Sequence, residues 1–345
     1  METCIIKNND IYAVYLWHNS IIQRKFVNDK WSEPISIAQT TEKNFSIIHS
    51  KNGDPIILYG DKDDNLMLAE GKKPHRMVLR NNDHNPIPFN MEGMIKDNII
   101  RLFYNKEYIK ESYLTEQHRY NDGSWSRPVI LDKYTSTTNM TKLIAIDNNY
   151  ILFYSKKVPE QQIGYREIGT YSTGDYKMLY ATGYKIIDYS IALTEDEIHL
   201  CILITTNRIN KLVYVKKDNN GLSKARTIYE GIIKGCHIAI INSKILITFS
   251  TIKGNMQITS YDMGITFNRV ETIDNFIFNK VSFIDYERQS PDTFCATELL
   301  NDVCCPYSIK FCPFINNKNE QEIDNLKREI ARLKKHQNHW LNQIN

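Results

Sequence analysis

The sequence repeats one short pattern along most of its length, in which a cluster of Asn, Asp or Gly precedes a run of apolar residues. β-Branched and aromatic residues favour strands, whereas Asn, Asp and Gly favour tight turns. The expected strands are 11–15, 56–59, 99–104, 150–154, 198–203 and 245–249, with a weaker copy at 292–295. Their ends recur about every 44 to 50 residues, a period that suits a unit of four antiparallel strands. These ends are Tyr15, Tyr59, Tyr104, Tyr154, Leu203, Phe249 and Phe294.

A second element recurs before the last strand of each unit. Residues 28–37 and 121–131 are near copies, each with an Asp turn, the pattern Trp-Ser-x-Pro and an apolar strand. Residues 218–223 form a degenerate copy. Proline is tolerated at the start of an outer, edge-type strand. The two repeats together predict seven units, of which the last is truncated: 1–40, 41–90, 91–135, 136–183, 184–231, 232–276 and 277–314.

The stretch 260–267 has the chemistry of a tight turn followed by a strand over 268–273. Asp262 can bond its own backbone, Gly264 tolerates a positive φ, and the hydroxyls of Ser260 and Thr266 can bond the turn. Phe267 then opens the strand.

These five residues resemble the Asp-box of sialidase-like β-propellers, S-x-D-x-G-x-T-[WF]. The resemblance implies a structural role for them, away from any active centre. It also implies an all-β fold, which we expect to be a seven-bladed β-propeller over residues 1–314, with a six-bladed ring as the alternative.

From residue 315 to 345 the pattern changes to that of an α-helix. Asn319 and Glu322 can form a capping box, and apolar positions then alternate in steps of three and four, as in a coiled coil. The seam predicted to drive oligomerisation is Ile323, Leu326, Ile330, Leu333, Gln337, Trp340 and Ile344. We expect self-association as a parallel dimer, with a trimer as the alternative. Packing of the helix on its own propeller is a further alternative.

Composition narrows the functional classes. The chain has 345 residues, 42% hydrophobic and 24% charged, with a net charge of +3. We expect no nucleic-acid binding, because the sequence has no long run of Lys and Arg. We expect no membrane span, because no apolar run reaches about 18 residues. The N-terminus lacks the features of a secretory signal. We therefore expect cytoplasmic synthesis, and a spore layer, a phage particle and a cytosolic complex are the alternative settings.

The seven cysteines do not suggest a disulfide framework. Cys201 and Cys236 lie in apolar strand patterns, so we expect buried thiols there. For Cys304, Cys305 and Cys312, buried thiols and cross-links between chains remain alternatives. Because neither Cys nor His shows metal-ligand spacing, we expect no metal and no cofactor.

Catalytic residues of a sialidase are not recognisable. Such an enzyme needs three arginines, a Tyr–Glu pair and an Asp acid, but the first unit contains only Arg24. The pairs Tyr165 with Glu167 and Tyr286 with Glu287 are expected in any Tyr-rich chain. The sequence therefore favours a non-enzymatic binding or assembly protein whose ligand is a glycan or a protein surface. The alternative is a sialidase-like glycoside hydrolase with a diverged active centre.

Overall fold

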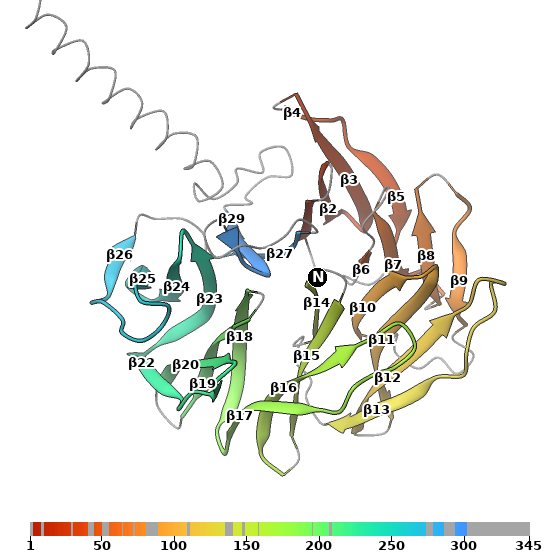
Figure 1. Ribbon diagram of the computed structural model, residues 1–345. Coiled ribbons are helices and arrows are strands. Elements are labelled where there is room, and N and C mark those ends of the chain that lie inside the picture. The colour runs from red at the N-terminus through yellow and green to blue at the C-terminus, as the bar shows by residue number, and fades with distance from the viewer. Residues whose placement is uncertain are drawn as a thin grey trace, which may run out of the picture.

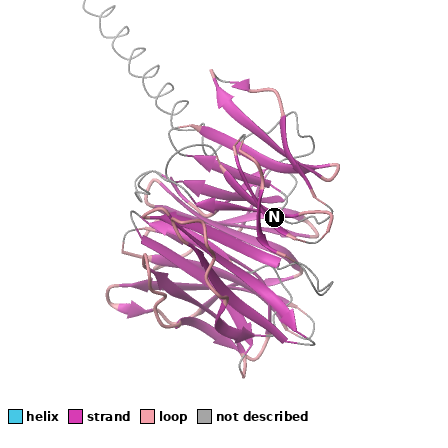
Figure 2. Cartoon of the chain, turned by 90° about the vertical axis from the view of Figure 1, so that its right-hand side faces the viewer, coloured by secondary structure: helices cyan, strands magenta, loops and turns pink. Residues whose placement is uncertain are grey.

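In the computed structural model, the described part of the chain runs from residue 3 to residue 301 and is built from β-strands (Figures 1 and 2). The segments in this range that are not described are 8–9, 29, 41–44, 50–54, 64, 72, 81–88, 109–110, 135–140, 147–148, 158, 195, 207–208, 274–278 and 286–293. The predicted helix 315–345 lies outside the described residues.

The strands form antiparallel meanders, numbered here 1 to 6 in chain order. Meander 1 contains β1 (Thr3–Lys7), β2 (Ile11–Trp17), β3 (Ser20–Val27), β4 (Lys30–Trp31) and β5 (Ile35–Gln39). Meander 2 contains β6 (Phe45–His49), β7 (Ile56–Gly60), β8 (Leu66–Glu70) and β9 (Arg76–Leu79). Meander 3 contains β10 (Phe89–Lys96), β11 (Ile99–Tyr108), β12 (Glu111–Arg119) and β13 (Val129–Tyr134).

The next three meanders follow the same plan. Meander 4 contains β14 (Lys142–Ile146), β15 (Asn149–Lys157), β16 (Gln161–Ile168) and β17 (Lys177–Thr182). Meander 5 contains β18 (Lys185–Leu193), β19 (Ile198–Thr205), β20 (Asn210–Asp218), β21 (Gly221–Leu222) and β22 (Arg226–Gly231). Meander 6 contains β23 (Ile233–Ile241), β24 (Lys244–Thr251), β25 (Gly254–Ser260) and β26 (Glu271–Ile273).

The meanders surround a common centre, which makes the described part a β-propeller (Figure 1). The predicted all-β class and the strand repeat are therefore confirmed, and the two Trp-Ser-x-Pro elements directly precede β5 and β13 as expected. The seventh repeat is represented by β27 (Asn279–Asp285) and β29 (Glu298–Asn301), which pair antiparallel. Strand β27 also pairs with β1 in parallel, so the two ends of the ring meet. Seven blades remain a prediction, because residues 302–314 lie outside the described part.

Two expected strands differ from the structure. Strand β26 begins at Glu271 rather than at residue 268, because the preceding residues complete the Asp-box turn. In the described part of the weak repeat at 292–295, Phe294–Cys295 forms β28, which pairs with β23. Strand β23 is the innermost strand of meander 6, so its inner edge offers free backbone groups to β28.

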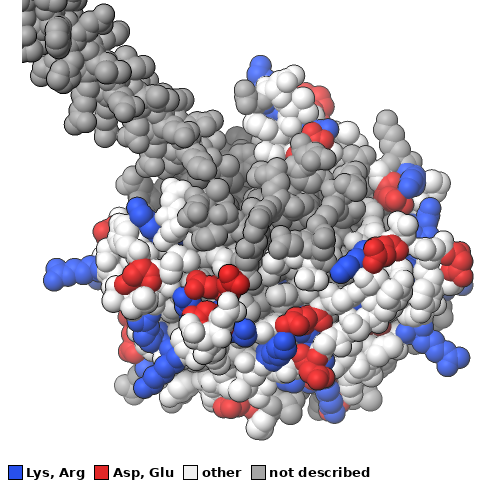
Figure 3. All heavy atoms as spheres, viewed as in Figure 1, with Lys and Arg blue, Asp and Glu red and all other residues white. Residues whose placement is uncertain are grey.

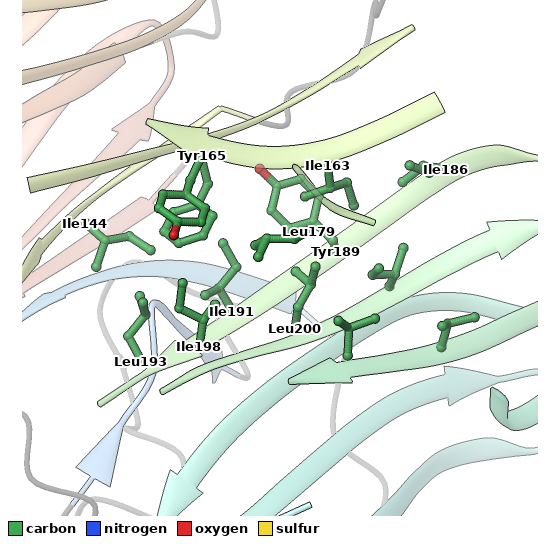
Figure 4. Close-up of a cluster of buried hydrophobic side chains, with 14 of the residues drawn as sticks. Ile144, Ile163, Tyr165, Leu179, Ile186, Tyr189, Ile191, Leu193, Ile198 and Leu200 are labelled. Atoms are coloured by element: carbon green, nitrogen blue, oxygen red, sulfur yellow. The ribbon is translucent and has the colours of Figure 1, made fainter. Parts of the chain in front are cut away.

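The hydrophobic core lies between neighbouring sheets. One buried cluster joins meanders 4 and 5, with Ile144 and Tyr165 on one side and Ile191 and Leu200 on the other (Figure 4). Cys201 and Cys236 are free and fully buried in the next cluster, as the apolar pattern predicted. Successive side chains of a strand point to opposite faces of its sheet, so both faces of the inner strands are buried between neighbouring sheets.

The turns fall on two opposite faces of the ring. Parallel pairing of β1 with β27 and of β6 with β10 shows that these innermost strands run in the same direction. Successive long strands alternate in direction, so the first turn and the third turn of each meander share a face. The Asp-box turn, between β25 and β26, is a third turn. We call its side the Asp-box face, and the turns β10–β11, β12–β13 and β16–β17 lie on this side as well.

Candidate functional site

The five predicted Asp-box residues meet in a single turn on the Asp-box face. The Asp262 carboxylate accepts bonds from the Ser260 hydroxyl (2.8 Å), the Thr266 amide (2.8 Å) and the Thr266 hydroxyl (2.6 Å). The Gly264 amide donates to the Ser260 hydroxyl at 2.7 Å, and Gly264 has a φ of 89°. The bonds from Thr266 and then Ser260 lower the pKa of Asp262 to about 2. The carboxylate is therefore occupied by its own turn.

This turn is also fastened to meander 5. The ring of Phe267 packs edge-on against Tyr214, with 4.9 Å between centroids. The guanidinium of Arg226 on β22 lies over both rings and donates to the carbonyl oxygens of Gly264 and Ile265. A side chain at Gly264 would collide with the Tyr214 hydroxyl. These contacts support the structural role that the resemblance implies.

We predict that Asp262→Ala lowers the thermal unfolding midpoint by roughly a few degrees, because the turn loses its shared acceptor. Ligand affinity should stay the same in the protein that remains folded. Calorimetry and binding measurements on the same preparation check both statements. A loss of binding at an unchanged midpoint would show instead that Asp262 touches ligand.

The remaining candidate residues either make local contacts or lie outside the described part. Arg24 donates to the carbonyl oxygens of Ser32 (2.6 Å) and Trp31 (3.3 Å), which holds the first Trp-Ser-x-Pro turn. Tyr165 is buried in the core, and Glu167 pairs with Lys177 at the surface. The candidate residues that lie outside the described part are Tyr286, Glu287, Cys304, Cys305, Cys312 and the seam Ile323, Leu326, Ile330, Leu333, Gln337, Trp340 and Ile344.

A network of charged side chains lies where the inner strands converge, and we call it the axial network. It consists of Lys142 on β14, Asp188 on β18, Lys280 on β27 and Glu298 on β29. Glu298 bonds Lys142 (2.6 Å) through one carboxylate oxygen and Lys280 (3.4 Å) through the other. Lys280 also pairs with Asp188 at 2.7 Å. The axial network thus pairs two ammonium groups with two carboxylates, an equal number of basic and acidic groups.

Neutral groups complete the axial network. The Ser190 hydroxyl donates to Glu298 at 2.7 Å, and the Cys236 amide donates to Asp188 at 3.1 Å. His237 donates through Nε2 to the backbone oxygen of Glu298 at 2.8 Å. All four carboxylate oxygens of Glu298 and Asp188 therefore have a partner. The axial network joins meanders 4, 5 and 6 to the final strand pair.

The pKa values of the buried titratable groups follow from two effects, burial and the charges of neighbouring groups. Burial alone would raise the pKa of Glu298, but Lys142 and Lys280 outweigh this effect and lower it to about 2. Burial likewise opposes the charge on Lys280, yet Glu298 and Asp188 raise its pKa. Burial lowers the pKa of His237 to about 4 and raises that of Glu92, a buried carboxyl group on β10, to about 8. Glu298 and Lys280 are thus charged at neutral pH, while His237 is neutral.

We predict that His237→Gln reduces the loss of stability on acidification. Because the pKa of His237 is about 4 when folded and about 6.5 when unfolded, the unfolded state binds an extra proton between these values. The free energy of unfolding must therefore fall as pH falls through this window. The variant should lose up to about 3 kcal/mol less between pH 7 and pH 4. Urea unfolding at both pH values measures this difference, and equal losses in the two proteins would contradict it.

A second buried network, which we call the Arg101 network, joins meanders 3 and 4 near the Asp-box face. Arg101 on β11 is 1% exposed and makes five hydrogen bonds, as many as its N–H groups allow. Two of these bonds go to the Glu116 carboxylate on β12. The others go to the Gly169 and Ser172 carbonyl oxygens and the Thr173 hydroxyl, all in the β16–β17 turn. This turn of meander 4 is thereby fixed to meander 3.

Glu116 connects the Arg101 network to a partly exposed histidine. Its carboxylate accepts bonds from the Thr173 hydroxyl (2.8 Å) and from His118 Nε2 (2.6 Å). Burial alone would raise the pKa of Glu116, but Arg101, His118 and Thr173 outweigh this effect and lower it. An ionised carboxylate only accepts hydrogen bonds, so we assign the proton to His118 Nε2. In the neutral ring, Nδ1 is then an acceptor.

Exposed aromatic side chains lie next to the Arg101 network. Tyr120 follows β12 directly and is 44% exposed, with its ring 6.5 Å from that of His118. Tyr171 lies within the fixed β16–β17 turn and is 74% exposed. The hydroxyl of Thr170 donates to Asp97, in the β10–β11 turn, at 2.9 Å. Positive and negative residues are interspersed over the described surface that Figure 3 shows.

Among the described residues, no group of three or more His, Cys, Asp or Glu side chains is arranged to hold a metal ion. No described helix is long and apolar enough to cross a membrane.

Comparison with known proteins identifies the fold. No family model matches the sequence, and neither does any curated protein. A family PL25 ulvan lyase, solved with a -[GlcA(1-4)Rha3S]- ligand, has a TM-score of 0.61 at 16% identity, covering 89% of this chain and 90% of its own. Polysaccharide lyase Uly1 has a TM-score of 0.54 at 9% identity, covering 86% and 89%. At these identities the likeness shows a shared fold, and the chain is a β-propeller similar in architecture to these lyases.

Proposed function

We propose that this protein is a non-enzymatic, carbohydrate-binding β-propeller that is displayed as an oligomer through its C-terminal helix. The observation that carries the proposal is a pair of exposed tyrosines on turns of the Asp-box face, Tyr120 (44%) and Tyr171 (74%). Tyrosine combines a large apolar ring with a polar tip and is enriched at binding surfaces. A rigid ring that presents such side chains together is suited to binding an extended ligand.

The axial network supports binding rather than catalysis. Its two ammonium groups are neutralised within the chain by Glu298 and Asp188, and each oxygen of these carboxylates has a partner. A catalytic acid or base must have its proton or lone pair available to substrate. The axial groups instead bond one another, as expected of a structure that closes a ring.

The predicted coiled coil gives the proposed function its multivalency. Weak contacts by separate rings add up when the rings are tethered, because the second contact forms at a high effective concentration. A shared glycan target on a surface would therefore be bound through avidity. This part of the proposal rests on the heptad pattern of residues 323–344.

Binding of the full-length protein to a printed array of neutral, uronic-acid-containing, sulfated and sialylated oligosaccharides tests the proposal. We expect retention on a subset of the array that free oligosaccharide reverses. Retention on none of the spots would overturn carbohydrate binding. Turnover of a fluorogenic sialoside would instead establish the hydrolase with a diverged centre.

A further inference from the structure

We propose that the surface between meanders 3 and 4 on the Asp-box face is a binding site for an uncharged saccharide. This inference rests on the proposed function and names the site and the ligand class. The site consists of Tyr120 and Tyr171 as stacking surfaces, with His118 and Asp97 as hydrogen-bond acceptors. These four side chains come from four different strands or turns of two meanders.

The stacking surface is held in place before any ligand arrives. Arg101 bonds the carbonyl oxygens on both sides of Tyr171, those of Gly169 and Ser172. The next residue, Thr173, is bonded to both Arg101 and Glu116. A ligand that stacks on Tyr171 therefore does not have to order the turn, and a preorganised site loses less entropy on binding. An exposed tyrosine on a fixed turn differs in this respect from one on an unanchored loop.

The polar groups of the site are acceptors. Glu116 accepts the hydrogen bond from His118 Nε2, so in the neutral ring Nδ1 presents a lone pair, and no hydrogen bond to Nδ1 exists among the described residues. One oxygen of the exposed Asp97 carboxylate accepts a bond from Thr170. An ionised carboxylate has room for about four bonds in all, so Asp97 can accept more.

This combination matches the chemistry of a sugar ring. The C–H face of a pyranose is apolar and packs on an aromatic ring, while its hydroxyl groups donate to acceptors at the edge. A carboxylate or a sulfate of the ligand that lay against the Asp97 carboxylate would be repelled by it. A neutral saccharide with free hydroxyls is therefore favoured over an acidic one.

The same oligosaccharide array tests the site with four full-length proteins. Tyr171→Ala should weaken retention on neutral oligosaccharides roughly tenfold, because it removes an exposed aromatic anchor. Asp97→Asn keeps an oxygen that can accept the Thr170 bond but removes the charge, and it should weaken retention several-fold. Tyr184→Ala is the matched control, since Tyr184 is 50% exposed and follows β17, at the other end of that strand. It should bind like the wild type.

The outcomes separate this inference from the proposed function. If the wild type is retained and neither Tyr171→Ala nor Asp97→Asn differs from it, the site is wrong while carbohydrate binding stands. If the wild type binds acidic spots alone, the neutral ligand class is wrong. If the wild type binds no spot, the proposed function fails and this inference fails with it. Thermal midpoints close to wild type in all variants would show that folding does not explain the losses.

Discussion

Glu298→Ala is expected to lower the free energy of unfolding on the order of 3–5 kcal/mol, the typical cost of removing one partner from a buried ion pair. The Glu298 side chain is 10% exposed and bonds both lysines of the axial network. Without it, Lys142 loses its carboxylate partner, and Lys280 keeps Asp188 as its carboxylate partner. The cluster is left with one uncompensated positive charge in a largely buried position, and the Ser190 hydroxyl loses its acceptor.

Glu167→Ala is the matched control for this prediction. Glu167 also forms an ion pair, with Lys177 at 2.5 Å, but its side chain is 60% exposed. Exposed pairs contribute little to stability. Urea unfolding followed by circular dichroism compares the two variants at the same pH. If Glu298→Ala is no more destabilising than Glu167→Ala, the axial network does not hold the ring together.

Cutting the chain after Asn317 is expected to convert the oligomer into a folded monomer. Burying Ile323, Leu326, Ile330 and Leu333 against a partner copy contributes on the order of 1.5–3 kcal/mol for each side chain. An isolated helix of this length is marginal in water, so association and helix formation depend on each other. Light scattering of the full-length and shortened proteins at matched concentration measures the change.

Point variants test whether the seam itself drives association. Leu326→Asp combined with Leu333→Asp places charges in the predicted seam and should also give monomers. Arg328→Asp combined with Lys335→Asp adds the same number of aspartates on the outer side of the predicted helix and should leave the oligomer intact. Added salt should weaken the oligomer only slightly, since exposed charge pairs supply tenths of a kcal/mol. A shortened protein that stays oligomeric would place the interface on the ring.

The repeat could be predicted from the sequence because each strand carries its own local signal. Turn residues before apolar runs located second strands such as β7 and β15, and the Trp-Ser-x-Pro elements located β5 and β13. The Asp-box turn was equally local, since the bonds of Asp262 and Ser260 within it join residues at most four positions apart. Local chemistry of this kind can be recognised in one sequence.

The axial and Arg101 networks could not be predicted in this way. Lys142 and Glu298 are 156 positions apart, and Arg101 and Thr173 are 72 apart. Each is a single polar residue in a strand or a turn, without any spacing that marks it. Only the closure of the ring and the packing of neighbouring meanders bring these side chains together. The same reason explains β28, whose pairing with β23 depends on which sheet edge is free.

The central claim is that rings bearing saccharide sites are joined by a C-terminal helix, and one comparison tests it most directly. Full-length protein and residues 1–317 are passed, at equal ring concentration, over a surface carrying the oligosaccharide that gives the strongest array signal. We predict that both bind, and that the full-length protein dissociates about a hundredfold more slowly through avidity. Absence of binding by both proteins, or equal dissociation of the two, would contradict the account.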